Sequence, residues 1–307
     1  MILLTGASGF IGNVLSKYLE NHKFEVRNSF RRKINDEDFQ LDLEKISEIK
    51  NSCKKIHTVI HLASLDFSQS EKNFKKAKKI NFIATKKLYE EALNNNVKNF
   101  IYFSTAYIYG ENLNNHVTEL TMPKPISNYA KTHYMSEDFL INNFSKNEIK
   151  TTILRISNIV GNPQSNKLDK WKYVANDFCL QAIKNKKIVL LTDGSQKRDF
   201  YSIDSLVETV KNIVQSKDNT SNLYNLGSGN SMSILQLAQI IKKECKLLFD
   251  IDIDIDIEIN YGKKQDKIQN LFYDVKKIKN SNLYTYDSPI SKSIISILTH
   301  CKKIINL

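Results

Sequence analysis

The sequence contains few of the residues that mark disulfide-rich, fibrous or membrane proteins. Of its 307 residues, 4 are cysteine, 4 are proline, 9 are glycine and 1 is tryptophan. The cysteines are widely scattered and form no C-x-x-C pair, which excludes a disulfide scaffold and favours reduced, buried thiols. No apolar run approaches the ~18–20 residues that cross a bilayer, and the opening residues lack the basic region of a signal peptide. We therefore expect a cytoplasmic globular protein with no membrane partner.

The charge is unbalanced, with 45 Lys and Arg against 33 Asp and Glu, a net charge of +12. Lysines are spread along the chain, and no basic stretch is interleaved with aromatic residues in a recognisable nucleic-acid-binding module. We therefore expect no nucleic-acid partner. No histidine or cysteine spacing suits zinc, so no metal site is expected either.

The first two-thirds of the chain alternate short apolar segments with longer helical patterns, which is typical of βαβ units and a parallel sheet. Strands are expected at residues 1–4, 24–30, 58–62, 99–104 and 151–156, and helices at 10–19, 73–94 and 129–143. The predicted fold is α/β: a Rossmann-type, doubly wound parallel sheet over residues 1–161. A smaller, mainly substrate-binding region over 162–307 is expected to pack against the sheet's carboxyl edge. Within it, residues 250–259 alternate acidic residues with isoleucine, which predicts a half-buried strand with solvated carboxylates.

A glycine-rich loop, TGASGFIG, directly follows the first strand and opens a helix. Gly6 permits a tight turn, Gly9 lets backbone N–H groups approach a pyrophosphate, and Gly12 allows close packing of helix on strand. The positive end of the helix then faces the phosphates. The loop predicts a dinucleotide site formed by Gly6, Ser8, Gly9, Phe10, Ile11 and Gly12.

The end of the second strand indicates which dinucleotide is bound. An acidic residue there would hold the ribose hydroxyls of NAD, but this sequence has Phe30 followed by Arg31 and Arg32. Guanidinium groups bind a 2′-phosphate bidentately, so the sequence favours NADP, with NAD possible. The alternative is that both arginines are solvated surface residues. Asp42 and Leu43 are placed to contact the adenine.

Several further motifs occur in a characteristic order along the chain. They include VIHLA (59–63), Asn81 before a helix, FSTAYIYG (103–110), Tyr129, LRISNIVG (154–161) and DGSQKRDFYSID (193–204). Together with TGASGFIG they resemble the extended short-chain dehydrogenase/reductase superfamily, in particular its NAD(P)-dependent nucleotide-sugar epimerase/dehydratase family. The resemblance covers nearly the whole chain. It implies a homodimer formed through helices 73–94 and 129–143, and it adds Leu62, Ala63, Ser64 and Asn81 to the cofactor-binding residues.

By motif position, the resemblance implies that Tyr129 is the acid/base and that Thr105 is its hydroxyl partner. A phenol with a pKa near ~10 must be made more acidic to work near neutral pH. Relatives use a lysine for this, four residues after the tyrosine, but here that residue is His133. Residues i and i+4 share a helix face, so His133 is expected beside Tyr129 and next to the cofactor. We expect it to donate to a ribose hydroxyl and to carry positive charge only near its pKa of ~6.5.

The resemblance also indicates which chemistry and which substrate to expect. The Asp-Glu pair of the family's dehydratases is replaced by Ala106 and Tyr107, so elimination of water is not expected. Thr105, Tyr107 and Asn158 match substrate-contacting positions, and Arg198 matches the arginine near the diphosphate, although it could instead pair with Asp199 or Asp204.

We therefore expect an NAD(P)-dependent enzyme acting on a nucleotide-diphosphate sugar at a ring carbon, C4 first. A 4-ketoreductase in surface-polysaccharide sugar biosynthesis is favoured, and a 4-epimerase with retained cofactor is the alternative. A hypothesis of a different class is a non-catalytic NADP-binding regulatory protein, suggested by His133 and the basic charge.

Overall fold

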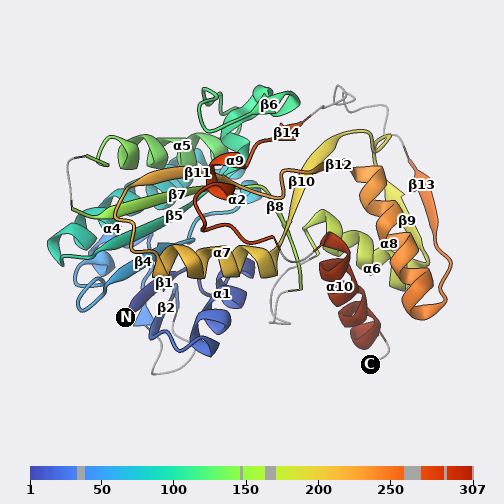
Figure 1. Ribbon diagram of the computed structural model, residues 1–307, viewed down its shortest axis with the longest axis horizontal. Coiled ribbons are helices and arrows are strands. Elements are labelled where there is room, and N and C mark those ends of the chain that lie inside the picture. The colour runs from blue at the N-terminus through green and yellow to red at the C-terminus, as the bar shows by residue number, and fades with distance from the viewer. Residues whose placement is uncertain (33–38, 146–147, 163–170, 259–270, 287–288, 306–307) are drawn as a thin grey trace. The chain divides into compact units, whose positions relative to one another are not determined.

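The computed structural model describes residues 1–32, 39–145, 148–162, 171–258, 271–286 and 289–305 (Figure 1). The chain divides into two compact units. Unit 1 comprises residues 1–112, 119–156 and 210–225, and unit 2 comprises 113–118, 157–209 and 226–307. Both units are therefore assembled from separate stretches of the chain. Among the described residues, no helix is long and apolar enough to span a bilayer.

Unit 1 is built on a seven-stranded sheet in the order β11-β7-β5-β4-β1-β2-β3. All described pairs from β3 to β7 are parallel, as predicted. The strands are β1 (Ile2–Thr5), β2 (Val26–Phe30), β3 (Phe39–Gln40), β4 (Thr58–His61), β5 (Asn99–Thr105), β7 (Lys150–Ile156) and β11 (Asn222–Leu226). The order reverses between β1 and β4, and ligands of such sheets bind at this switch point, beyond the carboxyl ends of the strands.

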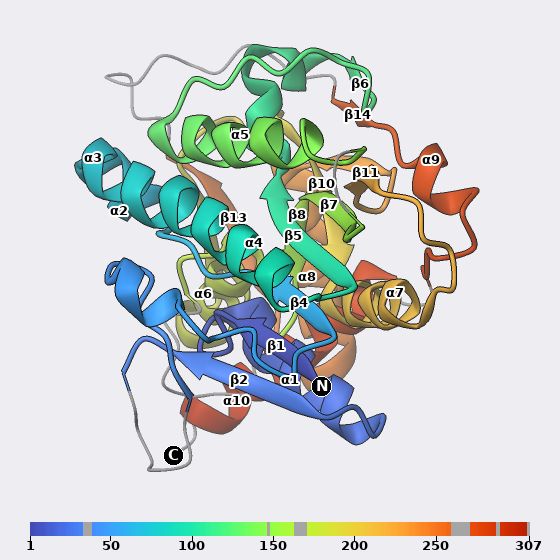
Figure 2. The same cartoon turned by 90° about the vertical axis from the view of Figure 1, so that its left-hand side faces the viewer.

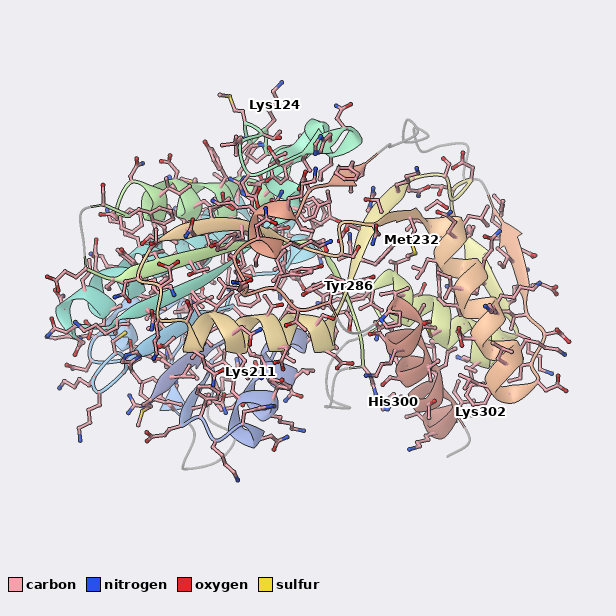
Figure 3. All side chains as sticks on the ribbon, viewed as in Figure 1. Lys124, Lys211, Met232, Tyr286, His300 and Lys302 are labelled. Atoms are coloured by element: carbon pink, nitrogen blue, oxygen red, sulfur yellow. The ribbon has the colours of Figure 1, made fainter. Side chains whose placement is uncertain are left out.

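Helices cover both faces of this sheet, so the fold is the predicted doubly wound one. Helix α1 lies on one face and helices α4 and α5 lie on the other (Figures 1 and 2). Lys211, from the part of α7 that belongs to unit 1, lies over the Tyr18 ring of α1 with Nζ 5.9 Å from the ring centre (Figure 3). The helical segments of unit 1 are α1 (Phe10–Asn21), η1 (Ile46–Ile49), α2 (Phe67–Lys72), α3 (Phe74–Ala77), η2 (Lys78–Ile83), α4 (Ala84–Asn94) and α5 (Asn128–Ile141), and a turn η3 (Ala106–Asn114) follows β5.

The predicted helix at residues 73–94 contains a π-helical turn. Asn73 caps the N-terminal end of this helical segment by accepting the Lys76 N–H, and the segment then runs through α3, η2 and α4. A π-turn adds one residue to a helical turn and shifts the side chains that follow it. Here the π-turn contains Asn81, which is buried.

The described residues of unit 2 form three small sheets, β12-β10-β8, β13-β9 and β14-β6. Helices α6, α8 and α10 pack together around a core that includes Cys179, Cys245 and Cys301. The bounds are β6 (His116–Val117), β8 (Asn158–Val160), α6 (Val174–Asn185), β9 (Lys187–Leu190), β10 (Lys197–Ser202), α7 (Ile203–Gln215), β12 (Ser231–Ser233), α8 (Ile234–Phe249), β13 (Asp254–Ile257), β14 (Phe272–Tyr273), α9 (Lys276–Lys279) and α10 (Ile290–Ile305).

The strand predicted at residues 250–259 is shorter in the structure. β13 pairs only through Asp254–Ile257, and Asp250, in a left-handed conformation, is the C-cap of α8. Residue 259 lies outside the described part of the chain. Ile253 is buried, whereas Ile257 is 48% exposed, so the expected division into inward isoleucines and outward carboxylates holds only in part.

Candidate active site

The loop after β1 needs glycine at two positions. Gly6 has a φ of 77°, and a Cβ atom on it would lie 2.9 Å from the Ala63 backbone nitrogen. A Cβ atom on Gly12 would overlap the Gly6 carbonyl oxygen. The Gly9 N–H donates to that same carbonyl at 2.9 Å and closes the turn. The loop therefore brings the N-terminal end of α1 to the carboxyl end of β1, at the switch point of the sheet, which is the arrangement that cradles a pyrophosphate.

The remaining residues predicted to line this loop differ in accessibility. Ser8 and Ser64 are exposed, Ile11, Leu62 and Ala63 are half-buried, and Phe10 is buried. Ser8 and Ser64 are thus the accessible side chains of this group. Phe10 begins α1 inside the protein, so a ligand would meet its backbone rather than its ring.

His61, in the VIHLA motif at the end of β4, joins the glycine loop to helix α4. Its Nδ1 lies 2.6 Å from Thr5 Oγ1, and its Nε2 lies 2.9 Å from Thr85 Oγ1. Because Thr85 donates its own proton to the Asn81 carbonyl at 2.7 Å, His61 donates from Nε2 and accepts at Nδ1. Burial lowers the pKa of His61 to about 3, so the ring is neutral and both of its nitrogens are bonded.

Asn81, predicted to bind the cofactor, uses its side chain within the protein. Oδ1 accepts the Leu65 N–H at 2.7 Å, and Nδ2 donates to Thr132 Oγ1 at 3.0 Å. Thr132 belongs to α5, so the amide connects the segment after β4 to that helix. Asn81 thus links these two segments, and its contact with a cofactor stays a prediction.

Arg31, predicted to bind a 2′-phosphate, is paired with carboxylates. Its NH2 lies 3.0 Å from Glu44 Oε2, and its Nε lies 3.7 Å from Asp42 Oδ1. Lys76 contacts the same Glu44 carboxylate at 2.9 Å, and its hydrogen bond lowers the pKa of Glu44. Arg32 is exposed and, within the described residues, forms no ion pair. Of the two arginines, Arg31 is therefore the one whose charge is balanced by carboxylates of the described residues.

Asp42 and Leu43, predicted to contact adenine, differ in orientation. Asp42 Oδ1 accepts the Glu44 N–H at 3.0 Å and stabilises the turn after β3. Leu43 is 6% exposed and its side chain packs in the core, so the expected adenine contact at this position is limited to the backbone.

Tyr129 and Thr105 lie on elements joined by an aromatic group. Thr105 ends β5, and its Oγ1 accepts the Tyr107 N–H at 3.2 Å. The Phe67 ring centre lies 6.1 Å from that of Tyr107 and 6.3 Å from that of Tyr129. Phe67 and Tyr107 are both nearly half exposed, so each offers ring surface to a ligand. The sequence analysis missed Phe67, whose only signal is its position just after the VIHLA motif.

His133 lies one turn after Tyr129 on α5, as predicted, with ring centres 4.4 Å apart and planes at 63°. Its Nδ1 lies 2.9 Å from the Tyr102 hydroxyl oxygen, while its buried Nε2 has no hydrogen-bond partner in the part of the chain that the structure describes. The expectation of an imidazole charged near pH ~6.5 is wrong. The side chain is 3% exposed, and burial lowers the pKa of His133 to about 4, so the ring is neutral.

The inward face of α5 continues to Glu137, one turn beyond His133. Arg155 on β7 holds the Glu137 carboxylate with both Nε and NH2, the latter at 2.7 Å. Arg155 NH1 also donates to the Tyr109 hydroxyl at 2.9 Å, and that hydroxyl donates to Asn225 Oδ1 at 2.6 Å. Burial alone would lower the pKa of Arg155, but Glu137 more than offsets it, so the guanidinium stays charged. This buried network anchors α5 to the sheet.

Asn158 and Arg198 lie in unit 2 on adjacent parallel strands. Asn158 pairs in register with Phe200 of β10, and Arg198 precedes Phe200 by two residues. Alternation along a strand places Arg198, Phe200 and Asn158 on one face. The Asn158 amide donates to the Asp199 carbonyl at 3.0 Å, and Arg198 NH1 donates to the Lys197 carbonyl at 3.2 Å.

The Asp199 carboxylate accepts from Ser228, through its N–H and its hydroxyl, both at 2.8 Å. On the other side of β10, Arg198 pairs in register with Met232 of β12 (Figure 3). Among the described residues, no group of three or more His, Cys, Asp and Glu side chains is arranged to hold a metal ion.

The chain is similar to known proteins over nearly its whole length. It is 29% identical over 310 residues to ADP-L-glycero-D-manno-heptose-6-epimerase of Brachyspira hyodysenteriae, covering 94% of this chain and 93% of the relative. Its fold matches UDP-glucose 4-epimerase of Thermotoga maritima, solved with UDP-glucose, at a TM-score of 0.84 and 22% identity, over 99% of each chain. It also matches RMD of Pseudomonas aeruginosa, solved with NADPH, at a TM-score of 0.81 and 17% identity, again over 99% of each chain.

The family profile described as "NAD dependent epimerase/dehydratase family" matches residues 2–227. This range contains the glycine loop, the Tyr129–His133 face of α5 and the Asn158 and Arg198 strands. The chain belongs to the NAD-dependent epimerase/dehydratase family.

Proposed function

We propose that the protein is a nucleotide-sugar epimerase that oxidises a ring carbon of its substrate, C4 in the first instance, and returns the hydride to the opposite face. The observation that carries this proposal is the Tyr129–His133 pair on one face of α5. Tyr129 would take the proton of the sugar hydroxyl as the carbon is oxidised, and it would return the proton after the keto sugar has rotated to present its opposite face. Thr105 would hold that hydroxyl, and Asn158 and Arg198 would hold the nucleotide part.

The cradle around Gly6 and Gly12 fits a dinucleotide, because side chains at either position would fill it. The bound nicotinamide would supply the hydride acceptor and donor. The neutral His133 ring would contribute a hydrogen bond to the ribose, but no permanent charge. Tyr129 would therefore be activated less strongly than beside a lysine.

Dehydration is not part of the proposal. Ala106 and Tyr107 follow Thr105 and provide no carboxylate pair to remove and deliver a proton during elimination. The aromatic surface of Phe67 and Tyr107 instead suits contact with the apolar face of a sugar ring.

We propose that any preference for NADP over NAD is carried by Arg32, since Arg31 is already paired with Glu44 and Asp42. This arginine is the specific observation that favours the second candidate, a 4-ketoreductase, which would consume NADPH at each turnover. The epimerase takes precedence because a relative that matches over 94% of this chain is an epimerase. The non-catalytic regulator is the least favoured, because the chain belongs to a family of enzymes and retains Tyr129 and Thr105.

Two properties stay predictions. A homodimer through α4 and α5 is supported by Ile83 and Ile141, which lie at or near these helices and are each more than a third exposed. Light scattering of the purified protein would test it. A cytoplasmic location is supported by the four free, buried cysteines, which suit a reducing compartment, and a role in surface-polysaccharide sugar biosynthesis stays a prediction with it.

The test is to incubate the enzyme with UDP-, dTDP-, ADP- and GDP-sugars carrying deuterium at C4 and to follow the products by NMR. An epimerase would give the C4 epimer with deuterium retained and no net change in NAD(P)H absorbance. A reductase would leave these sugars unchanged but would consume NADPH stoichiometrically with a 4-keto nucleotide sugar. If both assays show no turnover, the epimerase and reductase proposals both fail and the regulator remains.

A further inference from the structure

The hydrogen bond between Tyr102 and His133 joins two buried side chains behind Tyr129. Tyr102 lies on β5 and is 3% exposed, as is His133 on α5. The hydrogen bond between them joins the Tyr102 hydroxyl to His133 Nδ1 over 2.9 Å. The other imidazole nitrogen, Nε2, has no partner among the described residues. A neutral imidazole carries one N–H, so the direction of this hydrogen bond decides whether Nδ1 or Nε2 is protonated.

Two arrangements satisfy this hydrogen bond. In the first, the Tyr102 O–H donates to Nδ1, and Nε2 then carries the imidazole proton. In the second, Nδ1–H donates to the phenol oxygen, and the phenol O–H must then donate to the hydroxyl oxygen of Ser136, which also neighbours the phenol. The first is preferred, because an imidazole nitrogen is a much stronger base than a serine hydroxyl. Burial raises the pKa of Tyr102 well above its usual value, so the phenol keeps its proton to donate.

We propose that Tyr102 is a positioning residue that holds His133 in the Nε2–H tautomer and so turns a neutral histidine into a fixed hydrogen-bond donor. A buried N–H without an acceptor costs about 1–3 kcal/mol, so Nε2–H is poised for a ligand acceptor. That acceptor would be a hydroxyl of the cofactor ribose, and this last step rests on the proposed function. Tyr102 and His133 together would thus supply the hydrogen-bond donor that a lysine would provide, but not the positive charge of a lysine.

The first experiment needs neither substrate nor cofactor. Protein labelled with ¹⁵N at histidine is examined by long-range ¹H–¹⁵N NMR, and the His133 signals are assigned by their loss in His133→Gln. We expect His133 as the Nε2–H tautomer in the wild type and a mixture of both tautomers in Tyr102→Phe. The matched control is Tyr89→Phe, which removes another buried phenol hydroxyl from unit 1 and should leave the His133 signals unchanged. An Nδ1–H tautomer in the wild type, or an unchanged tautomer in Tyr102→Phe, would overturn the proposal.

The second experiment measures the binding of NAD⁺ and NADP⁺ by calorimetry. Tyr102→Phe should raise the Kd of the dinucleotide that binds by about three- to tenfold, the effect of one weakened hydrogen bond. In a His133→Gln background the same change should have no further effect, because Gln has no tautomer to select. An equal effect in both backgrounds would show that Tyr102 acts through general packing and would overturn its positioning role. If the tautomer depends on Tyr102 but the Kd does not, the ribose contact proposed for His133 is wrong and the tautomer assignment stands.

Discussion

Two buried histidines of unit 1 lie in contrasting surroundings. His61 at the end of β4 and His133 on α5 are each no more than 3% exposed, and Tyr102 neighbours both rings. Both ring nitrogens of His61, Nδ1 and Nε2, are hydrogen-bonded to threonine hydroxyls. In His133 only Nδ1 is bonded within the described residues.

The difference separates a structural histidine from one available to a ligand. Burial keeps both rings neutral, so charge does not distinguish them. Hydrogen bonding does: His61 has no capacity left for a ligand, whereas His133 has one donor or acceptor available beside Tyr129. A buried polar atom without a partner is costly in a native structure and usually has a functional explanation.

The largest expected effect concerns Tyr129, which lies beside His133, and it should appear in the turnover number. Tyr129→Phe keeps the ring beside His133 but removes the proton-transferring hydroxyl, so the turnover number should fall by about 10²–10⁴-fold. Cofactor affinity should change little. The control is Tyr134→Phe on the same helix, which should retain turnover. Steady-state kinetics with an accepted nucleotide sugar checks this, and full activity of Tyr129→Phe would contradict the mechanism.

Replacing each histidine by leucine should separate stability from binding. His61→Leu leaves the Thr5 hydroxyl without its acceptor, so the free energy of unfolding should fall by about 2–3 kcal/mol with little change in cofactor Kd. His133→Leu removes an unpartnered nitrogen together with one hydrogen bond, so it should destabilise less but raise the cofactor Kd by about tenfold. Urea unfolding and calorimetry measure the two quantities. The opposite pattern would mean that His61, not His133, faces the ligand.

Acid should destabilise the fold through both histidines. Below pH ~6.5 the unfolded chain binds a proton on each ring, while the folded chain binds none until about pH 4 at His133 and about pH 3 at His61. The free energy of unfolding should therefore fall as the pH falls, by about 2 kcal/mol for each histidine between pH 7 and pH 5. In His133→Phe the share of His133 should vanish. Urea titrations at the two pH values check this, and an unchanged pH dependence in the variant would show that His133 has the same pKa in the folded and unfolded chain.

The smallest expected effect concerns the adenosine end of the cofactor site. Arg32→Ala should reduce the ratio of NADP⁺ to NAD⁺ affinity by about fivefold, through loss of one charge-assisted contact. Arg31→Ala should change the ratio less, because Glu44 and Asp42 already balance Arg31. Calorimetry with both dinucleotides distinguishes the two variants. A larger effect of Arg31→Ala would show that its ion pairs open when the cofactor binds.

Local patterns in the sequence were enough to predict the parallel sheet and the glycine loop. Apolar strands alternating with amphipathic helices have few ways to bury their surfaces, and the spacing of Gly6, Gly9 and Gly12 dictates a tight turn whatever surrounds it. The i, i+4 spacing likewise placed His133 beside Tyr129. These features depend on neighbours along the chain, so the sequence alone determined them.

Tertiary structure decided what those residues can do. The pairing of Arg31 with Glu44 and of His133 with Tyr102 joins positions 13 and 31 residues apart, and nothing local in the sequence indicates such partners. The charge state of His133 also depends on burial between α5 and β5, which lowers its pKa to about 4. Sequence therefore determined which groups line one helix face, because a helix repeats regularly. Folding determined their protonation and their free hydrogen-bonding capacity, because both depend on distant residues that exclude water.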